Sequence, residues 1–143
     1  MRKHGIKLGV LIGVLCCFSC KEKQYAVEFI YENTLSQEVK IEFFNNLNAA
    51  GELLYHVQVP ARQEASFVVK QYESETLFSH IYSARLTFED SKSIIYHEVM
   101  QDSLQTNLLN VFNYTDNGNC LRMQITEKHY QEAIQNETAK PHQ

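Results

Sequence analysis

Apolar and polar residues alternate along most of this 143-residue chain, and this pattern limits the fold more than any other feature. A period of two places successive side chains on opposite faces of an extended strand, so each run predicts a strand with one buried face. The runs cover residues 25–32, 38–43, 53–59, 65–69, 82–88, 94–99 and 121–126. Short polar connections join most of them. We therefore expect an all-β fold, a single antiparallel β-sandwich of about seven strands, immunoglobulin-like or related.

The inward phase of six of these runs supplies the expected hydrophobic core. Its members are Phe29, Phe43, Val57, Phe67, Leu86 and Ile125. The pair Asn117-Gly118 predicts a hairpin turn before the last strand, and residues 102–110 look like the one long, exposed loop. After Thr126, which suits a helix N-cap, the period changes and predicts a helix over residues 127–136. A polar tail, 137–143, follows.

The first 19 residues have the three parts of an export signal. They are a basic start, an uncharged apolar run over residues 8–18, and a small residue, Ser19, before Cys20. The basic residues are Arg2, Lys3 and Lys7. This arrangement resembles the signal peptide of a bacterial lipoprotein, in which a peptidase cuts before a cysteine that is then acylated.

The resemblance implies a signal peptide over 1–19, a lipid on Cys20, a tether over 20–24 and a domain over 25–126. Cys17 is the alternative acceptor. An ordinary secretory signal and an uncleaved anchor are the other interpretations, although the apolar run is shorter than the ~20 residues that a spanning helix needs. Lipoproteins kept in the inner membrane of many Gram-negative bacteria carry Asp after the cysteine, so Lys21 favours the outer membrane.

Composition excludes some partners. Three of the 13 Lys and Arg residues lie in the expected signal and none of the 17 Asp and Glu do, which leaves ten against 17 and a formal charge of -7. Nucleic acid is therefore not an expected partner, because phosphate binding needs clustered Lys and Arg. Of the four cysteines, only Cys120 would stay free after cleavage and acylation, so we expect no intramolecular disulfide.

The chain lacks the spacing of known catalytic, zinc and phosphate-binding motifs, and we expect no metal and no cofactor. His56 and His97 lie on strand faces away from the apolar phase and are interpreted as surface residues rather than as a metal pair. A thiol nucleophile at Cys120 would need His80, His97 or His129 beside it. A half-buried structural cysteine is the simpler interpretation.

Three further features bear on binding and modification. Tyr72 and Phe78 flank a polar loop and form either a contact patch or the edge of the core. The carboxylate pairs Glu73 and Glu75, and Glu89 and Asp90, are interpreted as solvated turns. Asp-Ser-Leu at 102–104 resembles the site at which some Gram-negative bacteria O-glycosylate exported proteins, which makes Ser103 a possible glycosylation site.

These observations predict a lipid-anchored cell-envelope protein that is not an enzyme and serves as a binding or structural module. Its expected partners are the membrane, through the anchor, and an envelope or extracellular protein or glycan. The chain is similar in build to many small bacterial lipoproteins of unknown activity, which implies no specific chemistry. The alternative is a small envelope enzyme or inhibitor that acts on a polymer or protein through loops at the strand ends.

Overall fold

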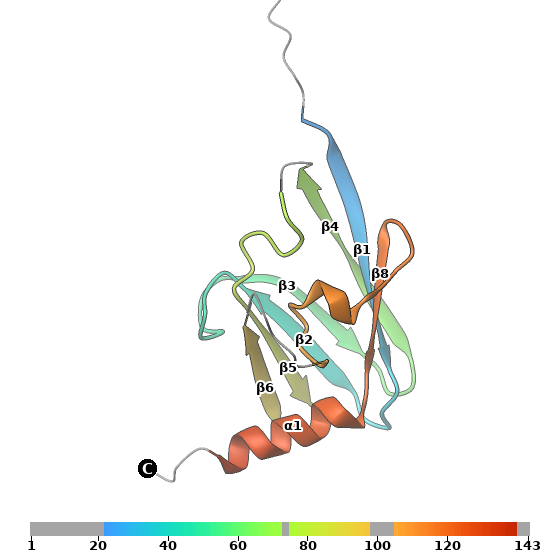
Figure 1. The fold of residues 1–143 in the computed structure, drawn as a ribbon. Coiled ribbons are helices and arrows are strands. Elements are labelled where there is room, and N and C mark those ends of the chain that lie inside the picture. Colours follow the sequence, from blue (N-terminus) through green and yellow to red (C-terminus); the bar gives the residue numbers. More distant parts are fainter. Residues whose placement is uncertain (1–21, 73–74, 98–104, 140–143) are drawn as a thin grey trace, which may run out of the picture.

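The computed structural model describes residues 22–72, 75–97 and 105–139, and the candidate sites Cys20 and Ser103 lie outside these ranges. The described part contains strands, one 3-10 turn and one α-helix (Figure 1). Their bounds are β1 Gln24–Asn33, β2 Val39–Phe44, β3 Leu53–Val59, β4 Glu64–Tyr72, β5 Ser83–Phe88, β6 Ser93–His97, η1 Val111–Asn113, β7 Thr115–Asp116, β8 Cys120–Ile125 and α1 Glu127–Thr138.

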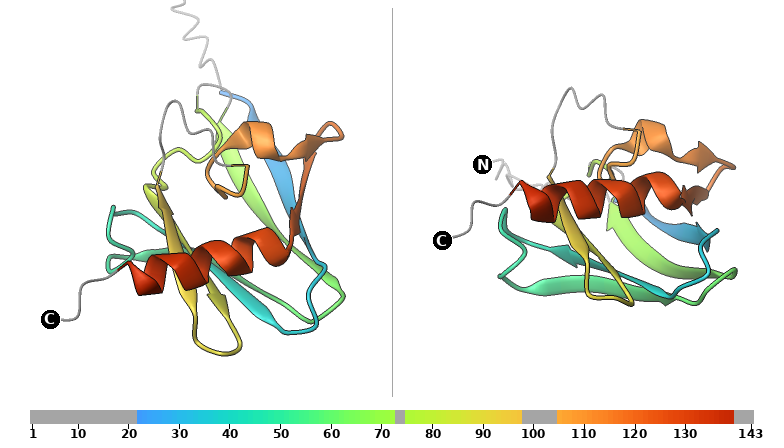
Figure 2. Two further views of the ribbon diagram at one scale, coloured as in Figure 1. Left: turned by 60° about the horizontal axis from the view of Figure 1, so that its bottom comes forward. Right: turned by 90° about the horizontal axis from the view of Figure 1, so that it is seen from below.

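The strands form two four-stranded sheets. Sheet A has the order β4-β1-β8-β7, and sheet B has the order β3-β2-β5-β6. The sheets face each other, and α1 lies across one opening between them, where it contacts β6 (Figures 1 and 2). The expected all-β sandwich with a short C-terminal helix is confirmed at this level.

The expectation of purely antiparallel pairing is wrong for sheet A. β1 pairs with β4 in the antiparallel sense but with β8 in the parallel sense, so that Glu28 lies beside Cys120 and Asn33 beside Ile125. The chain leaves sheet B after β6 and re-enters sheet A near the end where β1 begins, so β8 runs in the same direction as β1. Alternation has a period of two in both kinds of sheet, and the sequence pattern cannot distinguish them.

Aromatic rings fill the space between the two sheets. Phe29, in the middle of β1, is 2% exposed and stacks on Phe67 of β4, with the ring centroids 5.3 Å apart and the planes 13° from parallel. The rings of Phe43, Phe78 and Tyr114 lie against this pair. Of the six expected core residues, five are buried. Phe67 is only half-buried, because β4 is at the edge of its sheet.

The described part of the expected long loop is not exposed. Residues 106–109 are buried, and Leu108 is completely inaccessible. The hydroxyl of Tyr114 donates to the carbonyl of Leu108 at 2.7 Å. The Tyr31 hydroxyl lies 2.8 Å from the Tyr114 hydroxyl. A backbone buried in this way needs such partners, since an unpaired buried carbonyl is costly. Residues 106–109 therefore fill one opening of the sandwich, and Tyr114 connects them to Tyr31 of β1.

The hairpin before the last strand forms as expected, one residue further along than the motif suggests. Asn117 N–H donates to the Cys120 carbonyl at 3.0 Å, so Gly118 and Asn119 are the central residues. Gly118 has φ +80°, which the first position of a type II′ turn requires. Val111 and Phe112, which precede the hairpin, belong to the 3-10 turn η1, and the strand before the turn, β7, has only two residues.

Helix α1 starts after Thr126, as the sequence predicts, and runs two residues beyond the expected end. The Thr126 backbone N–H donates to Nδ1 of His129 at 3.1 Å, which satisfies a donor at the helix start. Ala133 is buried and Tyr130 packs edge-on against Phe88. No helix in the described residues is long and apolar enough to cross a bilayer.

The burial pattern predicts which substitutions unfold the domain. Phe43→Ala removes a fully buried ring and should cost ~3–5 kcal/mol, whereas Phe67→Ala, at the half-open edge, should cost about 2 kcal/mol. His56→Ala and His97→Ala should each change stability by about 0.5 kcal/mol or less, because both side chains are exposed. Chemical denaturation measures all four. Harmless Phe substitutions with disruptive His substitutions would contradict this core.

Candidate functional site

A cleft opens where β4 ends, on the side of the sandwich formed by β3 and β4. Its cavity has a volume of about 160 Å³ and lies between the last residues of β4, Tyr55 of β3 and residues 75–81. A cavity of ~150 Å³ lined by apolar side chains can hold benzene. The cleft is therefore large enough for one aromatic ring or a short aliphatic group, and too small for a folded element of another protein.

The floor of the cleft is the aromatic core itself. Phe29, Phe67 and Phe78 line it, and Tyr55 stacks on Phe67 with the centroids 5.4 Å apart and the planes 22° from parallel. Val69 and Ile81 add aliphatic surface. A flat apolar group entering the cleft would meet ring faces and edges that are already held in place by their neighbours, so little ordering would be needed on binding.

Polar side chains form the rim. Lys70, Glu75 and His80 lie around the opening. The Glu75 carboxylate accepts the Tyr72 backbone N–H at 2.9 Å through Oε2, and its Oε1 lies 3.9 Å from Nε2 of His80. Charges of both signs are thus present beside the apolar floor. Such a combination is typical of small-molecule and side-chain binding sites, in which a few polar groups orient an apolar ligand.

The segment that forms the outer wall carries backbone strain. Phe78 has φ +64° and His80 has φ +68°, a region in which bulky residues are rare and that costs on the order of 1–3 kcal/mol per residue. Ring contacts of Phe78 with Phe29 and Phe43 hold it there. The strained backbone directs Phe78 into the core and leaves His80 exposed at the rim.

Both interpretations of the Tyr72 and Phe78 pair are therefore partly right. Phe78 is buried at 8% exposure and belongs to the core, whereas Tyr72 is 45% exposed and borders the cleft. Glu75, interpreted from the sequence as a residue of a solvated turn, is half-buried on the rim. No pattern in the sequence indicates the cleft, because its wall forms only when residues 75–81 fold back over the end of β4.

The structure does not bring the histidines together as a metal site. His56 is on β3 and His97 is on β6, which are the two opposite edges of sheet B, and both are exposed. Among the described residues, no three His, Cys, Asp or Glu side chains are grouped so that they could hold a metal ion.

Cys120 is half-buried at the start of β8, and its Sγ lies 3.7 Å from Oε2 of Glu28. His129 follows the other end of β8, His80 is at the cleft rim and His97 is in the other sheet. The fold separates these groups instead of bringing a base to the thiol.

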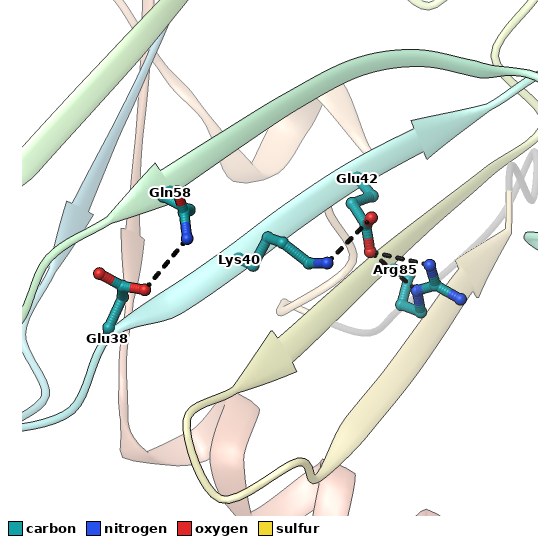
Figure 3. Close-up of polar contacts among 5 residues, drawn as sticks. All are labelled: Glu38, Lys40, Glu42, Gln58 and Arg85. Atoms are coloured by element: carbon teal, nitrogen blue, oxygen red, sulfur yellow. Dashed lines mark hydrogen bonds and ion pairs between the residues drawn. The ribbon is translucent and has the colours of Figure 1, made fainter.

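The outer face of sheet B carries a separate polar row (Figure 3). Glu42 accepts from Arg85 Nε at 3.0 Å and Nη2 at 2.9 Å, and it lies 3.1 Å from Nζ of Lys40. Burial opposes ionisation of this carboxyl, but the bonds from Arg85 and Lys40 outweigh it and lower the pKa of Glu42. Beside them, Gln58 donates to Glu38 at 3.3 Å. A carboxylate so fully paired is suited to holding β2 and β5 together rather than to proton transfer.

The expected tether leaves the domain beside the cleft. Gln24, the first residue of β1, is paired with Tyr72, the last residue of β4 (Figure 1). The chain before residue 22, including the lipidation candidate Cys20, lies outside the described residues, as does Ser103. The start of β1 and the end of β4 lie at the same end of the domain as the cleft.

Comparison with known proteins adds no family to this picture: no family model, no curated protein and no solved structure matches the chain.

His129 makes the stability of the domain depend on pH. Its burial, with a smaller effect of Lys128, lowers its pKa from 6.5 to about 4. The unfolded chain takes up a proton near pH 6.5 and the folded chain does not, so this contribution is complete above pH 6.5 and is lost as the pH falls towards 4. The full effect corresponds to about 3 kcal/mol.

Denaturation of the wild type and of His129→Gln between pH 4 and pH 7 measures this difference. The variant should lose much of the pH dependence over this interval. An unchanged pH dependence in the variant would show that His129 is not the responsible group.

Proposed function

We propose that the protein is a lipid-anchored cell-envelope protein whose domain, a sandwich of immunoglobulin-like or related type, binds its target through the cleft at the end of β4. It does so without catalysis. The observation that carries the proposal is the cleft itself, an apolar floor of fixed aromatic rings with a rim of Lys70, Glu75 and His80. The anchor is supported by the signal-like N-terminus and Cys20, and the Lys21 that follows favours the outer membrane.

The size of the cleft limits the part of the target that enters it. A single ring or short aliphatic group fits, such as the side chain of an envelope or extracellular protein, and the polar rim contacts the groups around it. Part of the wall is strained, and strained backbone tends to be retained at functional sites. A catalytic role has less support, because the cleft lining in the described residues contains no cysteine and brings no third residue to the Glu75 and His80 pair.

Metabolic labelling with palmitate tests the anchor. Cys20→Ala should abolish labelling and release the protein from the membrane fraction, because without acyl chains the contribution of ~0.8 kcal/mol per buried methylene is lost. Cys17→Ala is the matched control and should leave labelling intact. Labelling that survives in Cys20→Ala and disappears in Cys17→Ala would move the site to Cys17.

Photo-crosslinking in cells tests the cleft. p-Benzoylphenylalanine at Thr76, an exposed residue that lines the cleft, should give a discrete covalent adduct with the bound target. The same amino acid at Gln135, exposed on α1, is the control and should not give that adduct.

A second substitution distinguishes binding in the cleft from nonspecific cross-linking. Ser79→Trp places an indole in the cleft opening and should remove the adduct formed from position 76. Identical adducts from positions 76 and 135, or an adduct that Ser79→Trp leaves unchanged, would contradict binding through the cleft.

A further inference from the structure

The outer edge of β4 has no partner strand in the described part of the chain. β4 ends the order of sheet A and is nine residues long. The Asn33 N–H donates to the Gln63 carbonyl at 2.8 Å, which fixes the hydrogen-bonding phase of the β1–β4 ladder. Counting in steps of two, Ala65, Phe67 and Val69 bond to β1. The N–H and C=O groups of Ser66, Val68 and Lys70 therefore point outward from the sheet.

Among the described residues, the part of this edge from Glu64 to Lys70 lacks the usual protection against pairing, whereas the Tyr72 N–H at its end is bonded to Glu75. Exposed edges are commonly short, covered, bulged or interrupted by Pro or a central charge. β7, at the other end of sheet A, has two residues, and β6 is contacted by α1. In contrast, β4 has no Pro and no bulge, and the centre of its edge is Ser66-Phe67-Val68, with Val68 55% exposed.

The charges on β4 are complementary to those of a second, antiparallel copy of the same strand. Glu64 and Lys70 lie three residues on either side of Phe67 and belong to the same, outward-facing phase. Glu64 also pairs with Arg122 of β8 within the chain, and its side chain remains 56% exposed. If two β4 strands pair about Phe67, Glu64 of each copy lies opposite the partner's Lys70. Opposite charges directly across a strand pair are favourable, and like charges are unfavourable.

The backbone phase fits the same register. Pairing about Phe67 sets Ser66 opposite the partner's Val68, and both present their N–H and C=O groups to the free edge. They can therefore form a hydrogen-bonded pair, as can Glu64 with the partner's Lys70. On the inner face, Phe67 meets the partner's Phe67, which would cover a ring that the single domain leaves half-exposed.

We propose that two copies of the chain associate through antiparallel pairing of their β4 strands about Phe67, which joins their A sheets into one continuous eight-stranded sheet. The contact is isologous, so it closes at the dimer and gives no filament. It does not require the lipid anchor, and it shares Phe67 and Lys70 with the lining of the cleft. Because Gln24 lies beside Tyr72, the two tethers leave from opposite ends of the paired strands.

When Cys20 of both copies is acylated, both tethers must reach one bilayer. The four residues from Cys20 to Gln24 span at most about 14 Å. The paired sheet then lies along the membrane surface, with the two-fold axis normal to it.

A charge exchange between full-length copies with two different affinity tags tests the dimer. Wild-type copies should co-purify from cells. When both tagged copies carry Glu64→Lys, or both carry Lys70→Glu, the amount of the second copy that co-purifies should fall about tenfold. In each case like charges lie opposite each other at both symmetric positions. A Glu64→Lys copy with a Lys70→Glu copy restores both opposite-charge pairs and should return to the wild-type level.

Misfolding cannot explain the mixed result, because both single variants are present in it. Failure of the wild-type copies to co-purify, or failure of the mixed pair to recover, would overturn the proposal.

Two further measurements concern the register. A carbodiimide cross-link between Lys70 and Glu64 can form only between copies, because six residues of extended strand separate them by about 20 Å within one chain. Mass spectrometry of the wild-type dimer should find it, and its absence would refute this register. Val68→Pro removes an edge-facing donor and should abolish co-purification.

His56→Pro is the matched control for Val68→Pro. The Glu89 N–H donates to the Glu38 carbonyl, so the even-numbered residues of β2 bond to β5 and the odd-numbered ones bond to β3. His56 lies opposite Glu42, and its backbone N–H and C=O groups therefore point to the outer edge of β3. His56→Pro should leave the dimer intact. Equal loss of co-purification in the two Pro variants would argue against β4 as the interface.

Discussion

The stacking of Phe29 on Phe67 is the contact that connects the buried core to the open side of the domain. It joins the central strand of sheet A to its edge strand, with 5.3 Å between the ring centroids. Phe67 also contacts Phe43 of β2 and Tyr55 of β3, so the same ring spans both sheets. Aromatic pairs of this kind contribute about 0.5–1.5 kcal/mol beyond the burial of their area. The spacing of the sandwich is set by this group of rings.

The same rings explain why the core reaches the surface on one side of the domain. Two other openings of the sandwich are filled, one by α1 and one by residues 106–109, which Tyr114 ties to β1. At β4 the core reaches the surface, because Phe67, Tyr55 and Val69 line the cleft and the backbone beside them has no partner strand among the described residues. The cleft and the free edge are thus two consequences of one edge strand that carries core residues.

The sequence was sufficient for the strands and for most of the core, because both follow from local alternation. Val57, Leu86 and Ile125 are buried as their phase predicts. The direction of strand pairing could not be predicted from the sequence, since the parallel β1–β8 pair and the antiparallel pairs show the same alternation of apolar and polar residues. The buried loop was missed because Leu108 and Leu109 show no period, and they are buried only through contacts with distant strands.

The candidate site shows the same division. Tyr72 and Phe78 could be identified as unusual because aromatic residues flank a polar loop, but only the fold shows that one is core and the other rim. The positive φ of Phe78 had no sequence signal, since Phe is not among the residues that favour this region. Strain of this origin is imposed by tertiary contacts, and local propensity does not encode it.

Amide hydrogen exchange along β4 in the Lys70→Glu variant tests the central claim, that β4 is an open edge held to the core by Phe67. In this variant, whose copies pair about tenfold less, the Phe67 and Val69 amides, which bond to β1, should exchange slowly, and the Ser66 and Val68 amides, which face outward, should exchange fast. This alternation along a single strand is the result the account predicts. Slow exchange at all four amides would mean that another part of the chain covers this edge, and fast exchange at all four would mean that β4 is not held against β1; either result would contradict the account.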